Sequence, residues 1–174
     1  IGNLEAFEKA VPEDARTQLL NGALDRFAKI IFEYEGTIAK LWENTVLAFF
    51  GAPISHEDDP LRAIHAASQI LTEVKKISEE VESTYATPLQ LKLVMNSGSV
   101  VIGDIKSNLK FDFRSRNNTL ECMDVALRSA IQPCEIILLE NAYRFTKHIA
   151  KCEKLKDIHC EEIQTDLHLW RVEQ

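Results

Sequence analysis

Two short apolar runs on either side of a tight polar corner constrain the fold of this chain more than any other stretch. The runs Thr37–Leu41 and Thr45–Phe50 are rich in β-branched and aromatic residues, a composition typical of strands. A polar corner this short between two such runs is the pattern of a β-hairpin. The sequence therefore predicts a hairpin with Glu43 and Asn44 at its tip.

Helical patterns precede and follow this hairpin. Pro12 with Glu13 and Asp14 is typical of a helix start, because proline suits the first turn and acidic side chains favour the positive end of the helix dipole. Gly36 is expected to end this first helix. Apolar residues recur at steps of three and four in both predicted helices. The expected stripes are Leu20, Leu24, Phe27, Ile31 and Tyr34, and then Ile64, Ala67, Leu71, Val74, Ile77 and Val81.

The loop before the second helix contains His56, Glu57, Asp58 and Asp59, which are residue types that can bind metal ions. The sequence Asp58-Asp59-Pro60 is also typical of a helix start, and this favours a capping and solvated role for the loop over a metal site.

The remaining chain predicts further strands and two more helices. Alternating apolar residues indicate a half-buried strand over 89–96, which is expected to form a second hairpin with Val100–Ile105. The other expected elements are a strand at 111–114, a helix at 122–130, a strand at 133–139, a helix at 140–148 and two final strands between 155 and 172. Helix, two strands, helix, two strands is the order of a ferredoxin-like α+β core with a small C-terminal extension.

Composition limits the class of protein. The 174 residues suit one domain, with 45% apolar residues and a net charge of -7, which disfavours nucleic acid and anionic membranes as partners. Apolar runs are too short to cross a bilayer, so no direct membrane insertion is expected. The four cysteines lack the paired spacing of a zinc site, so reduced thiols in a cytoplasmic protein are expected.

The predicted hairpin resembles that of class III adenylate and guanylate cyclases, whose second strand ends in phenylalanine-glycine-alanine-proline, as Phe50-Gly51-Ala52-Pro53 does here. Lys40 stands where that family has a lysine. Glu43 and Asn44 stand where it has a glycine and a metal-binding aspartate.

The resemblance continues into the helix at 122–130, where the family has an asparagine, an alanine and an arginine. Ala126 and Arg128 match, whereas Asp124 replaces the asparagine. Gly98, Gly103 and the run from Pro133 to Ile137 also fit the family pattern.

The resemblance implies a cyclase-homology fold of type βαββαβ over residues 1–174, with an antiparallel-rich sheet and helices on one face. Its first strand and first metal-binding aspartate would lie at or before Ile1.

By the same resemblance, Arg128 is the expected catalytic residue, and Lys40, Asn117 and Asp124 occupy nucleotide-binding positions. Asn44 occupies a metal position that has lost its carboxylate and is expected not to bind. Counting from a different anchor places Arg114 rather than Asn117 at the base-reading position, and the register stays open.

The cyclisation reaction of class III cyclases needs two metal ions, which activate the ribose hydroxyl and neutralise the leaving group. An amide at Asn44 offers oxygen without charge, and the acidic pair Glu161-Glu162 replaces a region that often reaches the triphosphate. No cofactor is therefore expected in this form, and magnesium or manganese would be needed for activity.

Three functions follow as hypotheses. The first is a degenerate cyclase domain that dimerises and acts as a regulatory pseudoenzyme in intracellular signalling. The second is the non-metal half of a heterodimeric adenylate cyclase, supplying Lys40 and Arg128 to a site shared with another cyclase-type domain. The third is a weakly active homodimer that converts ATP or GTP to a cyclic nucleotide.

Overall fold

The computed structural model describes residues 1–174 except 43–44, 105–110, 116–117, 130–131, 162–163 and 174. The chain divides into two compact units. The first comprises residues 1–92 and 132–134, and the second comprises residues 93–131 and 135–174.

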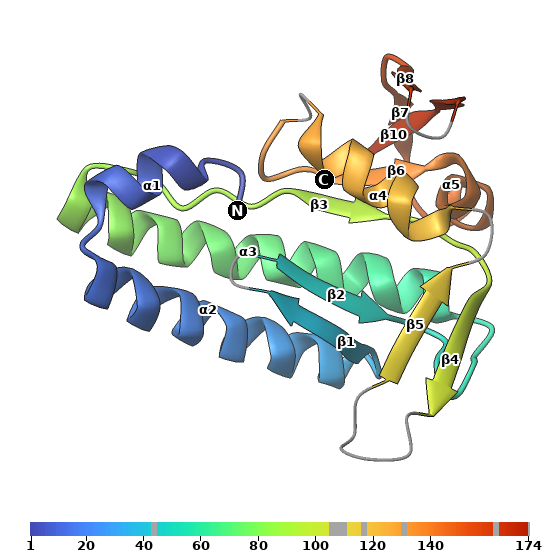
Figure 1. The fold of residues 1–174 in the computed structure, drawn as a ribbon, viewed down its shortest axis with the longest axis horizontal. Coiled ribbons are helices and arrows are strands. Elements are labelled where there is room, and N and C mark those ends of the chain that lie inside the picture. The colour runs from blue at the N-terminus through green and yellow to red at the C-terminus, as the bar shows by residue number, and fades with distance from the viewer. Residues whose placement is uncertain (43–44, 105–110, 116–117, 130–131, 162–163, 174) are drawn as a thin grey trace. The chain divides into compact units, whose positions relative to one another are not determined.

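Two long helices dominate the first unit: α2 (Glu13–Glu33) and α3 (Asp59–Tyr85) lie side by side and run in opposite directions (Figure 1). All six residues of the apolar stripe predicted for α3 are buried. Of the stripe predicted for the first helix, Phe27 and Ile31 are buried, whereas Leu20, Leu24 and the C-cap residue Tyr34 are only half-buried. The apolar periodicity therefore predicted both helices correctly, and it predicted the buried face more accurately for α3 than for α2.

Both ends of α2 have clear physical causes. The helix follows Pro12, and after it Gly36 N donates to Ile31 O at 2.8 Å. A Cβ at Gly36 would lie 2.8 Å from Ile31 Cγ2 and 2.9 Å from the Phe50 ring, which is closer than packed carbon atoms tolerate. The predicted end of the helix at Gly36 is confirmed. A shorter helix, α1 (Leu4–Ala10), which the weak pattern there did not indicate, precedes α2 and buries Phe7 completely.

The predicted hairpin is present in the first unit as β1 (Thr37–Trp42) and β2 (Thr45–Phe49). The strands are antiparallel, and Trp42 pairs with Thr45. Their register shifts between Ile38 and Lys40, as at a β-bulge. The expected tip residues Glu43 and Asn44 lie outside the described residues.

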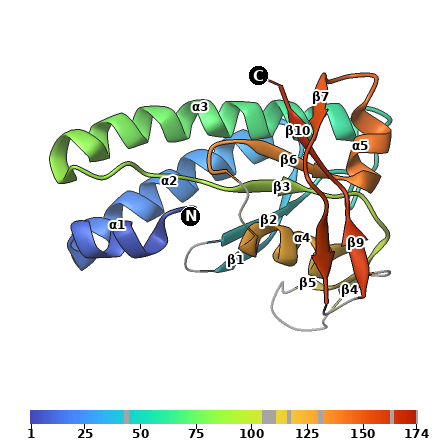
Figure 2. The same ribbon diagram turned by 90° about the horizontal axis from the view of Figure 1, so that it is seen from above.

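The second unit is built around a four-stranded sheet. Its order is β3 (Leu93–Met95), β6 (Ile136–Leu139), β10 (Leu169–Val172) and β7 (Cys152–Lys154). Figure 2 shows β10 between β6 and β7. All four residues of β6 are buried, as expected for a strand with neighbours on both edges and side chains packed on both faces.

Two short ribbons and two helices complete this unit. One ribbon pairs β4 (Val100–Asp104) with β5 (Phe111–Ser115), and the other pairs β8 (Ile158–Cys160) with β9 (Thr165–Leu167). The helices are α4 (Thr119–Arg128) and α5 (Glu140–Thr146).

The predicted pairing of the strand at 89–96 with the strand at 100–105 is wrong. Only Leu93–Met95 is a strand, and it pairs in parallel with β6. The neighbour of β4 is β5, which follows it in the chain. Parallel neighbours need a long crossover connection, here residues 96–135, and local alternation carries no information about such a distant partner.

The C-terminal stretch also differs from its prediction. Where two final strands were expected between 155 and 172, the described residues contain three short strands, β8 to β10, and β7 lies just before them. The reason is that β8 and β9 form their own ribbon, whereas β7 pairs with β10.

The predicted α+β class is confirmed. Five of the six strand pairings among the described residues are antiparallel, and the pairing of β3 with β6 is parallel. None of the helices in the described parts of the chain is both long and apolar enough to cross a membrane.

Candidate functional site

The helix α4 carries two of the expected site residues. Asp124 and Arg128 are one helical turn apart, and Arg128 Nη2 lies 2.8 Å from Asp124 Oδ2. Both side chains are exposed, by 66% for Asp124 and 58% for Arg128. The structure therefore brings the candidate catalytic arginine and the acidic replacement together as an ion pair.

Packing determines which face of α4 is exposed. Ala126 is fully buried in a core cluster with Ile137, Leu139, Cys160, Leu167 and Leu169, and Cys122, Met123 and Val125 pack against the same cluster. Positions 124 and 128 fall on the opposite side of a 3.6-residue period. The apolar stripe of α4 thus presents the Asp124–Arg128 pair to solvent.

The loop after β3 fixes the start of α4. Asn96 Nδ2 donates to Thr119 O at 3.1 Å, and Asn96 Oδ1 accepts from Ser97 N at 2.9 Å. Gly98 lies so close to the buried Thr119 side chain that a Cβ there would overlap it. The close packing of the backbone at Gly98 against Thr119 therefore requires a glycine at this position, whether or not the residue has the role that the cyclase resemblance implies.

Lys40, the expected nucleotide-binding lysine, lies in the first unit, and Asp124 and Arg128 lie in the second. Lys40 is an exposed residue of β1 and pairs with Leu47 of β2, just after the shift in register. The hairpin thus holds Lys40 on a paired strand.

The other expected site residues are less informative. Asn44 and Asn117 lie outside the described residues. Arg114, the alternative to Asn117, lies in β5 opposite Val101. Of the acidic pair, Glu161 is exposed in the turn after β8, and Glu162 lies outside the described residues.

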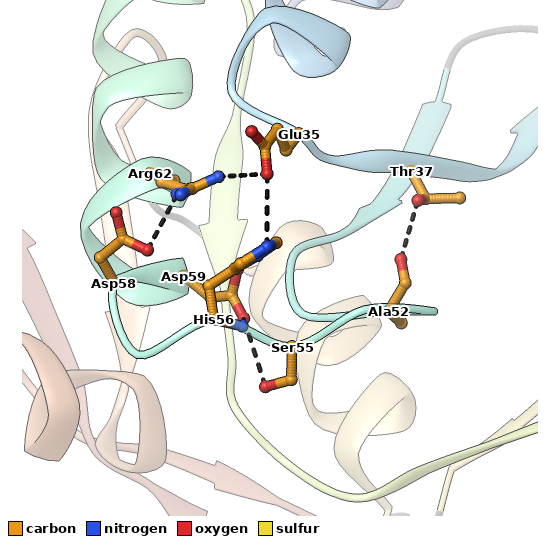
Figure 3. A network of polar contacts seen from close by, with 8 residues as sticks. All are labelled: Glu35, Thr37, Ala52, Ser55, His56, Asp58, Asp59 and Arg62. Carbon is orange, nitrogen blue, oxygen red and sulfur yellow. Dashed lines mark hydrogen bonds and ion pairs between the residues drawn. The ribbon is translucent and has the colours of Figure 1, made fainter.

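A second polar cluster lies at the corner between β2 and α3 (Figure 3). Arg62 Nη1 lies 2.5 Å from Glu35 Oε2, and Arg62 Nε lies 2.9 Å from Asp58 Oδ1. His56 lies between Glu35 Oε2 at 3.5 Å and Asp59 Oδ1 at 3.4 Å. We call these five residues the corner cluster; it joins the end of α2 to the start of α3.

The structure corrects the capping role expected for Asp58. Asp58 occupies the N-cap position but makes no side-chain cap hydrogen bond, because its carboxylate turns to Arg62. Asp59 instead reaches back, and its Oδ2 accepts from His56 N at 2.7 Å and from Ser55 Oγ at 3.4 Å. The predicted start of α3 is right, and the residue that ties down the preceding loop is Asp59.

Hydrogen bonds in the corner cluster shift two pKa values. The hydrogen bond from Arg62 lowers the pKa of Asp58 below its ordinary value. Hydrogen bonds to Asp58 and Glu35 raise the pKa of Arg62. Sequence reasoning identified the aspartates but not Glu35 or Arg62; the spacing of Asp58 and Arg62, four residues apart on a helix, was the available signal.

The histidine, cysteine and acidic side chains of the described residues were compared with the requirements of metal binding and of a reactive thiol. Within the described ranges, no group of three or more histidine, cysteine, aspartate or glutamate side chains is arranged to hold a metal ion. All four cysteines are free. Burial raises the pKa of Cys122 and of Cys152, and a raised pKa makes a thiol less reactive at neutral pH.

Comparison with solved structures identifies the fold. The adenylyl cyclase CyaB from P. aeruginosa matches with a TM-score of 0.83 and 22% identity, over 99% of this chain and 89% of that chain. The chain has the fold of a class III nucleotidyl cyclase catalytic domain. This agrees with the cyclase-homology fold expected from the hairpin.

Two guanylyl cyclases support the same conclusion. Cya2 matches with a TM-score of 0.81 and 18% identity, over 97% of this chain and 85% of that chain. A non-canonical dimeric guanylyl cyclase domain of the RhoGC fusion protein from the aquatic fungus Blastocladiella emersonii matches with a TM-score of 0.76 and 18% identity, over 98% of this chain and 89% of that chain. No protein-family model and no curated protein matches the sequence.

Proposed function

We propose that this nucleotidyl cyclase homology domain is a degenerate one, which dimerises and acts in signalling as a regulatory pseudoenzyme. The observation that carries the proposal is the ion pair between Asp124 and Arg128 on α4. In the resemblance to class III cyclases, Arg128 steadies the charge that develops on the reacting phosphate. Here that guanidinium already faces a carboxylate of its own helix.

The ion pair alone would not prevent nucleotide binding. Exposed pairs contribute about 0–1 kcal/mol, so a polyphosphate could displace Asp124 from Arg128. What would continue to oppose nucleotide binding is the negative charge that the carboxylate of Asp124 adds beside Arg128. For unit charges about 5 Å apart at an effective dielectric of about 20, the repulsion is about 3 kcal/mol. That is a rate or affinity loss on the order of a hundredfold, and solvent at this exposed position reduces it.

The metal position supports the same proposal. Asn44 supplies an amide oxygen where the resemblance expects a carboxylate, and magnesium prefers anionic oxygen ligands. Losing one full charge next to two divalent ions costs several kcal/mol even at a screened dielectric. The residue does not fit a two-carboxylate site, and a magnesium- or manganese-dependent step is therefore not part of the proposal.

A direct assay tests it. The purified domain is incubated with ATP or GTP and manganese, and cyclic nucleotide is measured by mass spectrometry. We expect no product above the level of Arg128→Ala. Clear turnover by the domain alone, lost in Arg128→Ala, would instead establish the weakly active homodimer.

One observation favours a second candidate. Lys40 and Arg128 are both retained and both exposed, as a non-metal half of a heterodimeric adenylate cyclase would require. In that case turnover of ATP appears only after mixing with a cyclase domain that bears the metal-binding aspartates, and it disappears with Lys40→Ala or Arg128→Ala.

Dimerisation is tested separately from catalysis. One fold relative is described as dimeric, and this supports the expectation of a homodimer here. Sedimentation equilibrium over a range of concentrations should give twice the 19.8 kDa of the chain. A monomer at all concentrations would remove the homodimeric form of the proposal and leave the heterodimeric candidate.

A further inference from the structure

The last turn of α5 and the residues that follow it expose two large apolar side chains of the second unit. Phe145 is 61% exposed and Ile149 is 47% exposed. The helical turn continues past the end of α5, because Ala150 N donates to Thr146 O at 2.9 Å. Residues four positions apart in such a turn lie on the same face, so Phe145 and Ile149 form one apolar edge.

The opposite side of α5 is anchored within the same unit (Figure 2). Ala142 and Thr146 are 5% and 1% exposed. The Tyr143 ring stacks on the Trp170 ring of β10, with the two centroids 3.7 Å apart and the planes at 6°. These contacts hold the helix in one orientation, so its apolar edge stays on the solvent side.

Basic residues lie beside this apolar edge. Residues 144–156 contain five lysine or arginine residues and one glutamate, whereas the whole chain has a net charge of -7. Arg144 and Lys147 are three positions apart and are therefore neighbours on the exposed half of the turn. The exposed residues of this turn form what we call the α5 patch: Arg144, Phe145, Lys147, His148 and Ile149.

The cations of the α5 patch are accessible to an anionic partner. Arg144 Nε lies 3.1 Å from Glu140 Oε1, but the arginine side chain is 67% exposed. An ion pair this exposed contributes little to stability, so Arg144 can exchange Glu140 for a carboxylate of a partner. Lys147 is exposed and belongs to no ion pair among the residues that the structure describes.

Apolar and basic groups side by side fit a partner with apolar and acidic groups side by side. An acidic amphipathic helix has this arrangement, with bulky apolar side chains on one face and carboxylates next to them. An anionic membrane fits less well, since two apolar side chains and a few cations give only weak attachment. The chain outside residues 144–156 has a net charge of -11, and an extended anionic surface would repel it.

We propose that the α5 patch binds an acidic amphipathic helix of another protein. Bulky apolar side chains of the partner cover Phe145 and Ile149, and its carboxylates pair with Arg144 and Lys147. This inference does not rest on the proposed function, because α5 carries none of the expected site residues and the test contains no nucleotide.

A synthetic peptide tests the proposal. The probe is a fluorescein-labelled helical peptide of about 18 residues with leucine on one face and glutamate on the other. Its binding to the full 174-residue chain is followed by fluorescence anisotropy. We expect binding that weakens as salt is added, and about tenfold weaker binding of a peptide with glutamine in place of glutamate.

Variants of the α5 patch locate the binding. Phe145→Ser and Ile149→Ser should each weaken peptide binding about tenfold, because each removes an apolar side chain that the peptide covers. Lys147→Glu should weaken it about fivefold, because it places a like charge opposite the glutamates. Since Lys147 is exposed, this variant keeps the test valid if an apolar replacement affects folding.

The matched control is Phe32→Ser. Phe32 is 59% exposed in the first unit, so its replacement removes a phenylalanine of similar exposure and should leave the affinity unchanged. The proposal is overturned if the peptide does not bind, if binding persists in all three variants of the patch, or if Phe32→Ser causes an equal loss.

Two other occupants of the patch give different results. If the chain binds phosphatidylglycerol vesicles through Phe145 and does not bind the peptide, the patch faces a membrane. If Phe145→Ser lowers the mass of the chain in sedimentation equilibrium, the patch is a contact between two copies. Either result overturns the proposal.

Discussion

The corner cluster of the first unit and the Asp124–Arg128 pair of the second are both groups of charged residues at the surface. They differ in which segments of the chain their ion pairs connect. In the corner cluster, Arg62 meets two carboxylates, Glu35 from the end of α2 and Asp58 from the start of α3. On α4 the pair is local to one helix and more than half exposed. The corner charges connect distant segments, whereas the contact between Asp124 and Arg128 lies within one helix. We therefore expect a structural role for the first group and propose a ligand-binding role for the second.

The strongest test of this comparison is Gly51→Ala beside the corner cluster. Gly51 has a φ of +87°, and an added Cβ would lie 2.6 Å from Asp59 Oδ2. Backbone strain and the displaced carboxylate together should lower the free energy of unfolding by about 2–3 kcal/mol, measured by urea denaturation.

The matched control is the same substitution at Gly22 in α2, where an added Cβ meets nothing within 4 Å. There the better helix propensity of alanine should raise stability by about 0.5–1 kcal/mol. Equal effects at the two glycines would show that close packing does not distinguish the corner.

Asp59→Ala is expected to have the next largest effect. It removes the acceptor for His56 N and Ser55 Oγ at the start of α3. A lost hydrogen bond of this kind costs about 1–2 kcal/mol. Asp124→Ala, measured by the same denaturation, should change stability by less than about 0.5 kcal/mol; a comparable loss there would contradict the contrast between the two groups.

Asp124→Asn tests the ligand side of the comparison. Removing the carboxylate beside Arg128 should tighten the binding of manganese–ATP by up to about tenfold, or 1.4 kcal/mol, with thermal stability unchanged. Binding is measured by calorimetry, and Arg128→Ala should abolish the gain. Unchanged affinity in Asp124→Asn would contradict the repulsion on which the proposed function rests.

Restoring the metal position alone should not restore catalysis. In Asn44→Asp the acidic side chains of Asp124 and Glu161-Glu162 are still present, so we expect no cyclic nucleotide in the manganese assay. Robust activity of this single variant would show that one missing charge is the whole defect.

The smallest expected effect is on acid stability. The pKa of Asp58 is lowered from its ordinary 3.8 by Arg62, so its stabilising contribution is complete above that value. The contribution is lost as the pH falls through the lower, folded-state pKa. In Arg62→Met this part of the acid dependence should disappear from unfolding curves recorded between pH 2 and 5. Lys29→Met, which removes an exposed charge elsewhere in the first unit, controls for net charge.

Local patterns predicted those parts of the fold that depend on neighbours in sequence. The apolar stripe of α3, the end of α2 at Gly36 and the pairing of β1 with β2 all follow from residues a few positions apart. The pairing of β3 with β6 could not be found in this way, since its two strands are separated by about forty residues and the pattern of each is compatible with several neighbours.

The candidate sites show the same division. Asp124 and Arg128 could be placed on one helix face from their spacing alone. The contact between Arg62 and Glu35 could not, because it depends on how α2 ends and α3 begins. The contact between His159 and Asp166 depends on the register of β8 and β9, which a stretch of short strands does not specify.

The position of β10 has a consequence for biosynthesis. This strand lies between β6 and β7, although both of them emerge from the ribosome before it. Until Leu169–Val172 has been translated, β6 and β7 each have an open edge, and open edges are templates for aggregation. Nascent chains of this domain should therefore need protection by chaperones until almost the whole of the second unit has been made.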